Sequence, residues 1–158
     1  MPSPRYPLEC VVQVHDGKVE KAKRDVAAAV GARRAADGAR ITAEERRDRH
    51  EALVGRVRVA ELDALARGEL RAGDLQRARQ WALGVAAESA RLRAEAERAQ
   101  GEALRAGAVE ERARAHLTAR KVDAEATARN RARWQHARRA KVEAREEEAS
   151  LEAWRPKK

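Results

Sequence analysis

The sequence has almost none of the residues that build a globular core. Its 158 residues include no Phe, one Tyr and one Met, and much of the 43% that counts as hydrophobic is alanine, which buries little area per residue. A globular domain of this length needs a larger core. Charged residues make up 39% of the chain. A composition rich in Ala, Glu, Arg and Leu is typical of long helices and coiled coils.

Cysteine, proline and long apolar runs are also scarce. Cys10 is the only cysteine, so the chain can form no internal disulfide. No stretch approaches the roughly 20 apolar residues of a membrane span, and no apolar run of signal-peptide length follows the start. We therefore expect a cytoplasmic protein without an integral membrane segment. The prolines lie at positions 2, 4, 7 and 156. This distribution brackets one or more long helices, because proline is excluded from helix interiors.

The charge balance is strongly basic. The formal net charge is +9 and the isoelectric point is about 10.5, which favours acidic partners such as nucleic acid, anionic lipid or an acidic protein surface. A disordered basic chain would carry a similar charge. An apolar periodicity that persists over many turns favours folded helices instead.

The first predicted helix covers about residues 8–67. Its apolar residues recur at steps of three, four and seven, as in a coiled-coil seam. The seam consists of Leu8, Val12, Val19, Ala22, Val26, Ala29, Leu53, Val57, Ala60 and Ala64. Between residues 32 and 49 the seam is poor, with Arg33 and Arg40 at expected core positions, so this zone should be soft. The valines at 11–14 could instead begin a strand, but no matching second strand follows.

A turn is predicted at about residues 68–74. Gly68 is expected to end the first helix in the left-handed conformation, and Asp74 to cap the next helix by accepting from its first free amides. A connection this short makes the two helices antiparallel neighbours. The sequence therefore predicts an all-α protein, with residues 1–158 forming a single elongated coiled-coil hairpin.

The second predicted helix covers about residues 74–154, and its seam is cleaner near the turn. The seam there is Leu75, Ala78, Ala82, Val85, Ser89, Leu92, Ala96, Ala99, Ala103 and Ala106. This predicts a tight, alanine-lined pairing beside the turn. Further along, the apolar residues shift register, which predicts a stutter in the heptad. They are Val109, Ala113, Leu117, Ala119, Val122, Ala126, Ala137, Ala140, Ala144, Leu151 and Trp154. Glycines inside both helices predict marginal stability.

The sequence contains no motif for catalysis, a cofactor or a metal. It lacks a phosphate-binding loop, a glycine-rich dinucleotide turn and a nucleophile elbow. The four histidines never lie at i and i+4 or in a His-Glu-x-x-His frame, so we expect them on solvated helix surfaces. These absences predict a protein that is not an enzyme and has no cofactor or metal site.

A basic block surrounds Trp134 and permits three interpretations. It consists of Arg129, Arg131, Arg133, Arg138, Arg139 and Lys141. It could bind nucleic acid, but Arg133 and Trp134 stand where a basic-region helix places paired alanines. It could be a solvated face with i to i+4 ion pairs. We favour a protein-docking face. Trp81, Trp134 and Trp154 either cover the edge of the seam or offer an anchor to a partner. A nucleic-acid-binding coiled coil and a generic dimeric scaffold remain the alternatives.

Three stretches carry a resemblance to a known family. They are residues 5–14 (RYPLECVVQV), the Gly73-Asp-Leu break, and the closing helix with Lys121, residues 128–134 (ARNRARW) and residues 146–154 (EEEASLEAW). Together, in order and spacing, they resemble the central-stalk proteins of type III secretion, which include flagellar FliJ and the injectisome YscO-like (SctO) proteins. The resemblance spans nearly the whole chain.

The resemblance implies a non-enzymatic antiparallel coiled coil, similar to the central shaft of rotary ATPases. In the family, the end with both termini enters a hexameric secretion ATPase at the base of the membrane-embedded apparatus. The turn points to the cytoplasmic domain of the export gate, and some members engage secretion chaperones. Carried onto this sequence, the ATPase-binding candidates are Lys18, Lys21, Lys121, Arg131, Trp134, Arg138 and Arg139. The export-gate candidates are Leu75, Ala78, Trp81 and Val85. His15 stands where the family commonly has a basic residue, which leaves Lys18 as the firmer contact.

Overall fold

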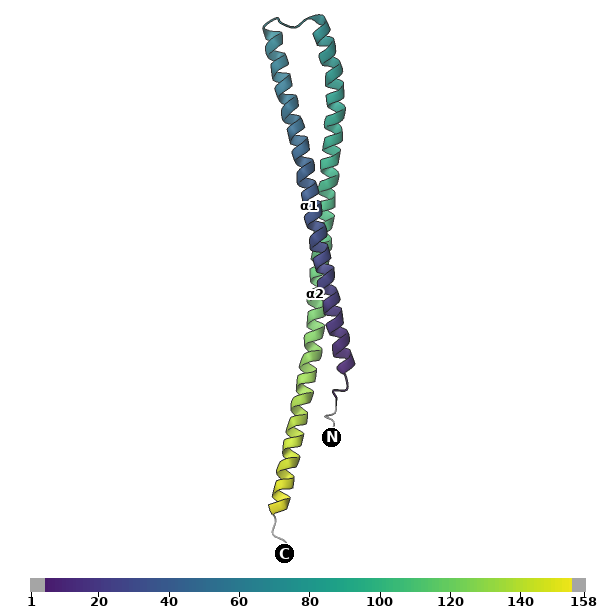
Figure 1. The fold of residues 1–158 in the computed structure, drawn as a ribbon, viewed down its shortest axis with the longest axis vertical. Helices are drawn as coiled ribbons and strands as arrows, with labels where there is room; N and C mark the ends of the chain where they lie inside the picture. Colours follow the sequence, from purple (N-terminus) through teal and green to yellow (C-terminus); the bar gives the residue numbers. More distant parts are fainter. Residues whose placement is uncertain (1–4, 155–158) are drawn as a thin grey trace. The chain divides into compact units, whose positions relative to one another are not determined.

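The computed structural model describes residues 5–154, and two long helices account for nearly all of them. Helix α1 spans Glu9–Ala66 and helix α2 spans Ala72–Trp154, against the predicted 8–67 and 74–154 (Figure 1). The described residues contain no strand, and the valines at 11–14 lie inside α1. The predicted all-α fold, two helices in an antiparallel hairpin, is confirmed.

The turn between the helices begins with a Schellman motif. Gly68 has a φ of 69°, in the left-handed region. Its N–H donates to the carbonyl of Leu65 at 3.0 Å, and the N–H of Glu69 donates to the carbonyl of Ala64 at 3.0 Å. These two bonds satisfy carbonyls that the end of α1 would otherwise leave free. The predicted role of Gly68 is confirmed.

Asp74 acts at the start of α2 in a different way from the one predicted. The carbonyl of Arg71 accepts the first helical bonds, from the N–H groups of Asp74 at 2.9 Å and Leu75 at 3.2 Å, so Arg71 is the capping position. The Asp74 carboxylate reaches back and accepts from the Arg71 N–H at 2.9 Å. This is the return half of a capping box. The expectation that Asp74 itself caps the first free amides was wrong, because the capping position is Arg71, three residues earlier.

The capping contact gives a testable titration. The Arg71 N–H, and secondly the Arg77 guanidinium, hold the pKa of Asp74 below its ordinary value of 3.8. Because the folded pKa is lowered, this contact contributes stability above pH 3.8 and loses it as the pH falls through the folded pKa. We expect an NMR titration of the Asp74 carboxyl to show the lowered pKa. Arg77→Ala should return it only part of the way, and a full return would contradict the larger role of Arg71.

The chain divides into two compact units, and each helix contributes to both. The terminal unit comprises Met1–Ala27 and Arg112–Lys158, and the turn unit comprises Ala28–Glu111. The expectation of a single hairpin domain remains a prediction. Each unit has its own helix pair and its own seam.

The seam of the turn unit follows the predicted register of α2 and corrects that of α1. In α2 the buried residues are Val85, Leu92, Ala96, Ala99 and Ala103, all of them predicted seam positions. In α1, Val54 is buried whereas Leu53 is 50% exposed. Ala43, in the zone where the seam is poor, packs against Ala96 and Ala99. The seam of α1 therefore keeps steps of three and four through 43, 47, 50 and 54. The predicted seam position at the apolar Leu53 was wrong by one residue.

Beside the turn, the predicted tight pairing is wrong. The helices of the turn unit separate toward the turn (Figure 1). Leu62, Leu65 and Leu75 are exposed, and so is Ala82, a predicted seam residue. The tightest packing lies further from the turn, at Ala96 and Ala99. Leucines from both helices line a groove there instead of being buried, and the short alanine side chains bury little area between the helices.

The zone predicted to be soft is bridged by an ion pair. The carboxylate of Glu110, which is 3% exposed, lies 3.2 Å from Nη1 of Arg33 on the opposite helix. Arg40 pairs along α1 with Glu44 at 2.8 Å. Arg33 and Arg40 thus keep their seam positions through ion pairs, although the prediction treated them only as defects.

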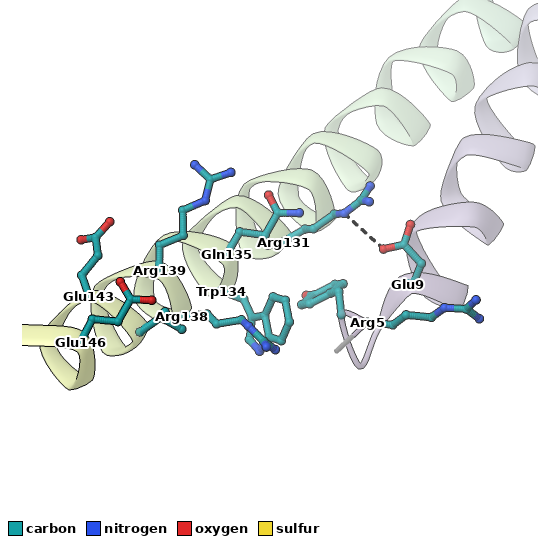
Figure 2. Close-up of a pocket in the computed structure, with 11 residues that line it drawn as sticks. Arg5, Glu9, Arg131, Trp134, Gln135, Arg138, Arg139, Glu143 and Glu146 are labelled. Carbon is teal, nitrogen blue, oxygen red and sulfur yellow. Dashed lines mark ion pairs between the residues drawn. The ribbon is translucent and has the colours of Figure 1, made fainter. Parts of the chain in front are cut away.

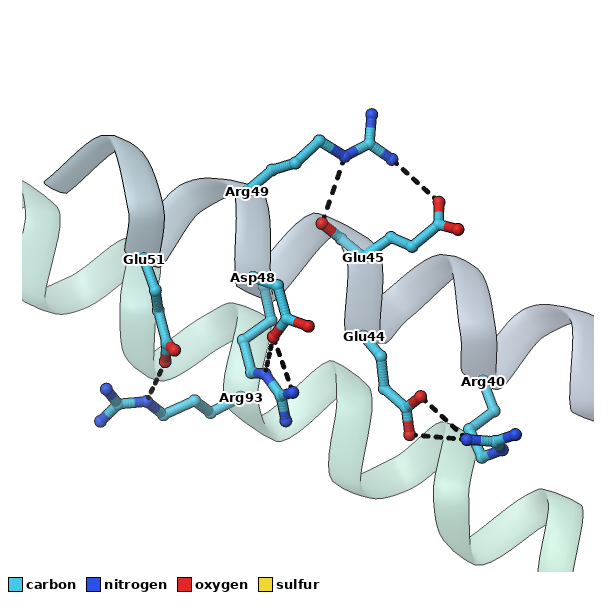
Figure 3. Close-up of polar contacts among 8 residues, drawn as sticks. Arg40, Glu44, Glu45, Asp48, Arg49, Glu51 and Arg93 are labelled. Carbon is cyan, nitrogen blue, oxygen red and sulfur yellow. Dashed lines mark hydrogen bonds and ion pairs between the residues drawn. The ribbon is translucent and has the colours of Figure 1, made fainter. Parts of the chain in front are cut away.

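Further polar contacts join the helices of the turn unit. Figure 3 shows the pair between Arg93 of α2 and Glu51 of α1, at 3.1 Å, among pairs within α1 such as that of Arg49 with Glu45. His50 lies 3.0 Å from the hydroxyl of Ser89, and both residues are half-buried seam positions. The expectation that all four histidines lie on solvated surfaces was therefore wrong for His50, and it was wrong also for His15, which is half-buried. A polar layer of this kind can fix the register of a helix pair.

The seam of the terminal unit continues without the predicted stutter. All but one of the half-buried positions of α2 in this unit continue the steps of three and four, and they are Ala113, Leu117, Arg120, Ala124, Thr127, Arg131, Trp134 and Arg138; the exception is Asp123, beside Ala124. The apolar Ala119, Val122 and Ala126, predicted to carry the seam, are exposed. In α1 the matching buried residues are Val12 and Ala22. Polar residues with long side chains occupy the seam because their aliphatic stems cover it while their heads reach water.

Within residues 5–154, neither helix has a stretch apolar enough to cross a membrane.

Candidate functional site: two docking grooves

The two units differ sharply in charge. The terminal unit carries 19 Lys and Arg against 11 Asp and Glu, a net +8, whereas the turn unit carries 16 against 15, a net +1. Almost the entire net charge of +9 therefore belongs to the terminal unit. An acidic partner would be attracted to that unit.

The main concavity of the terminal unit is a groove of about 770 Å³, which we call the terminal groove. It is formed by the start of the chain and the later part of α2 (Figure 2). The residues that line it are Arg5, Tyr6, Glu9, Arg131, Trp134, Gln135, Arg138, Arg139, Val142, Glu143 and Glu146. Four of the seven ATPase-binding candidates are among them.

Trp134 is the centre of the terminal groove. Its ring lies 5.4 Å from that of Tyr6, centroid to centroid, with the planes tilted by 60°. The guanidinium carbon of Arg138 lies 5.5 Å from the Trp134 centroid, within the range of a cation–π contact. Tyr6 is only 9% exposed. The indole therefore anchors Tyr6 to α2, besides offering part of its surface to the groove.

A charge pair completes the wall of the groove. Nε of Arg131 lies 3.2 Å from a carboxylate oxygen of Glu9 (Figure 2). The same Nε is buried and makes no aligned hydrogen bond, so the contact is an ion pair without good hydrogen-bond direction. Charge attraction depends on the distance between the groups and little on the angle, whereas a hydrogen bond requires alignment. Arg131 thus has a structural partner, and its charge is partly neutralised.

The other candidates of the terminal unit lie outside this groove. Lys121 lines a second, smaller hollow of about 280 Å³ beside Asp16 and Lys23. Lys18 and Lys21 are exposed on α1 and line neither hollow. His15 is half-buried in the seam, and within the described residues its Nδ1 is buried without a hydrogen-bond partner. It does not share the exposed face of Lys18.

Sequence reasoning missed Arg5, Tyr6 and Glu9 as site residues. They are more than 120 positions away from Arg131 and Trp134 in the chain. The one available signal was that Tyr6 is the only tyrosine of a chain that lacks other aromatic core residues. In an antiparallel hairpin the residues before the first helix lie beside the later part of the second helix, which contains Trp134.

Past the residues that lie opposite the start of α1, the α2 helix continues without a helix beside it (Figure 1). The α1 helix has 58 residues and α2 has 83, and all of 139–154 is exposed. Trp154 is 84% exposed and Leu151 is 68% exposed. We call residues 139–154 the overhang.

The turn unit has a groove of a different kind. This turn groove has a volume of about 650 Å³ and lies where the helices separate. It is lined by Val57, Arg58, Glu61, Leu62, Leu65, Leu70, Asp74, Leu75, Arg77, Ala78 and Trp81. Three of the four export-gate candidates, Leu75, Ala78 and Trp81, therefore share one apolar surface. Val85 does not, since it is buried in the helix pair at 9% exposure.

The described part of the chain contains no group of three or more potential His, Cys, Asp or Glu ligands that could hold a metal ion. The candidate surfaces are two open grooves with aromatic, aliphatic and charged walls. Such surfaces are suited to contact with macromolecules.

Comparisons with known proteins define the fold class. No family model and no curated protein matches the chain. Among solved structures, the chain is similar to a protein of Chlamydia trachomatis described as a candidate YscO homologue. The TM-score is 0.81 and the identity 21%, over 96% of this chain and 92% of the other. The protein thus has the two-helix hairpin fold of that structure.

Proposed function

We propose that the protein is a non-enzymatic stalk of a type III secretion apparatus, which couples the cytoplasmic secretion ATPase ring to the export gate. The observation that carries this proposal is the similarity in fold to a candidate YscO homologue over 96% of the chain. The sequence resemblance points to the same family. The chain would act in the cytoplasm at the base of the apparatus.

The charge distribution supports the assignment of the terminal unit to the ATPase. A net charge of +8 attracts acidic walls of a ring. Lys18, Lys21, Lys121 and Arg139 have no ion pair within the described residues and remain available to a partner. A helix pair is asymmetric in cross-section, so each subunit of a surrounding ring meets a different face. Nucleotide hydrolysis and stalk orientation can then bias each other.

The turn groove supports the assignment of the turn unit to the gate. Its apolar lining and Trp81, which is 36% exposed, suit an anchor contact with a protein. Secretion chaperones are further candidate partners of the exposed helix faces.

The first test measures the ATPase rate. We expect the purified chain to raise the rate of its cognate secretion ATPase. Lys121→Glu/Arg139→Glu should lower this stimulation about tenfold, because it reverses two unpaired charges of the terminal unit. The matched control is Arg98→Glu, at an exposed position of the turn unit, which should stimulate normally. Absence of stimulation by the native chain, together with tight salt-sensitive binding to mixed-sequence DNA, would instead support the nucleic-acid alternative.

The second test measures binding to the cytoplasmic domain of the export gate. Leu75→Ser/Trp81→Ala removes apolar surface from the turn groove and should weaken binding about tenfold or more. Leu83→Ser is the control, since Leu83 is 70% exposed and does not line the groove. ATPase stimulation should be unchanged in both variants. Equal binding by both would assign the gate contact to another surface.

A further inference from the structure

We propose that the overhang pairs with the overhang of a second copy of the chain, in antiparallel orientation. The first observation is the continuation of the intramolecular seam. After Trp134 and Arg138, its steps of three and four reach positions 141, 145, 148 and 152, which are all charged. The overhang therefore offers α1 nothing apolar on its seam face.

Four apolar residues of the overhang lie on a different face. With Ala137 just before the overhang and with one glutamate, they form a stripe at steps of three and four, which we call the C-terminal stripe: Ala137, Ala140, Ala144, Glu147, Leu151 and Trp154. Every one of these side chains is exposed. The stripe is offset by one residue from the seam, which rotates it by about 100° around the helix. A helix that packs on the stripe is therefore a different one from α1.

Large and small residues of the stripe match in an antiparallel pair. If residues whose numbers sum to 291 face each other, Trp154 lies over Ala137 of the second copy, and Leu151 over its Ala140. Each large side chain then meets a small one, which is the arrangement that fills a helix interface. Glu147 faces Ala144 near the two-fold axis, where the interface is open to water.

The charges match in the same register. Ala140 and Glu147 are at position d of the heptad, so Lys141 and Glu148 are at position e. In an antiparallel coiled coil the e residues of one helix face the e residues of the other. This places Lys141 beside Glu148 of the second copy, and by symmetry Glu148 beside its Lys141. In a parallel pair, Glu143 would face Glu148, so the parallel arrangement is disfavoured.

The overall charge order also favours a second copy over a uniformly charged partner. The residues at 138–141 are mostly basic and those at 143–152 mostly acidic. An acidic surface would be repelled by the second block and a basic one by the first. In an antiparallel pair, the overhang of a second copy places its acidic block beside the basic block of the first, and its basic block beside the acidic one. Within residues 139–154 of the described chain, no charged side chain has an intrachain ion pair, so these charges are available.

The test is sedimentation equilibrium of the isolated full chain. The stripe contributes one Leu and one Trp per copy, so we expect a reversible dimer with a Kd on the order of 10–100 µM. Lys141→Glu replaces two attractive contacts with two Glu–Glu contacts, and Glu148→Lys creates two Lys–Lys contacts. Each variant alone should dimerise at least about tenfold more weakly. An equimolar mixture of the two should recover association, since every contact is then between opposite charges.

A matched control separates this register from general charge effects. Arg139→Glu and Glu146→Lys make the same charge changes on the outward side of the stripe, and each should dimerise like the native chain. A native chain that is monomeric at several hundred micromolar, or a mixture that fails to recover association, would overturn the proposal. The measurement contains no ATPase or gate protein, so its outcome is separate from that of the proposed stalk function.

Discussion

The variant Gly31→Ala/Gly38→Ala/Gly107→Ala should be more stable than the native protein by about 3 kcal/mol. All three glycines lie inside helices of the turn unit, and a Cβ built at any of them meets no atom within 4 Å. Alanine therefore adds helix propensity of roughly 1 kcal/mol at each site without a packing cost. A circular-dichroism melt should show a rise in Tm of roughly 6–12 °C. An unchanged Tm would mean that these helix segments do not limit stability.

Gly68→Ala is the control of opposite sign. No atom lies within 4 Å of a Cβ at Gly68 either, but its φ is +69°. An alanine there strains the backbone, so we expect a loss of about 1 kcal/mol. The comparison separates helix propensity from a general benefit of added methyl groups. If Gly68→Ala also stabilised the protein, the Schellman end of α1 would not be rigid in solution.

The register of both helices could be predicted in part from the sequence. The seam positions that were predicted wrongly have one cause. Where apolar residues occupy the heptad, as at Leu92 and Ala96, the predicted positions are buried. Where Glu110 or Arg120 occupies it, the prediction moved to the neighbouring Val109 or Ala119 and inferred a stutter. Helix geometry keeps the register through polar positions when their side chains find a partner or extend along the seam. That partner is not visible in a one-dimensional pattern.

The candidate site was predicted to a similar extent. Basic residues around Trp134 and apolar residues around Trp81 were identified from the sequence. In the structure Arg131, Arg138 and Arg139 line the terminal groove with Trp134, and Leu75 and Ala78 line the turn groove with Trp81. The sequence did not show that Trp134 is packed against Tyr6, nor that Val85 is buried. Both depend on contacts between residues distant in the chain. Local composition contains no information on such contacts.

The second large effect is expected at Glu110, which holds a carboxylate inside the seam of the turn unit. Arg33→Leu removes the cation 3.2 Å from this carboxylate, which is 3% exposed. The loss of this pair should cost about 2 kcal/mol, less than for a fully buried pair because Arg33 itself is half-exposed. Glu110→Leu should instead stabilise the protein by about 1–3 kcal/mol, because leucine suits a seam position and the freed Arg33 can be hydrated. Urea unfolding followed by circular dichroism measures both changes.

The opposite signs of these two substitutions distinguish burial from simple loss of an ion pair. If the pair itself were the stabilising contribution, both variants would be destabilised equally. Arg46→Leu gives the matched reference. Arg46 also lies 3.2 Å from a glutamate of the opposite helix, Glu95, but the side chains of Arg46 and Glu95 are both exposed. Its loss should cost less than about 1 kcal/mol. The double variant Arg33→Leu/Glu110→Leu should be at least as stable as the native chain. Once the Glu110 carboxylate is gone, the loss of the Arg33 cation no longer leaves that carboxylate with one ion pair fewer.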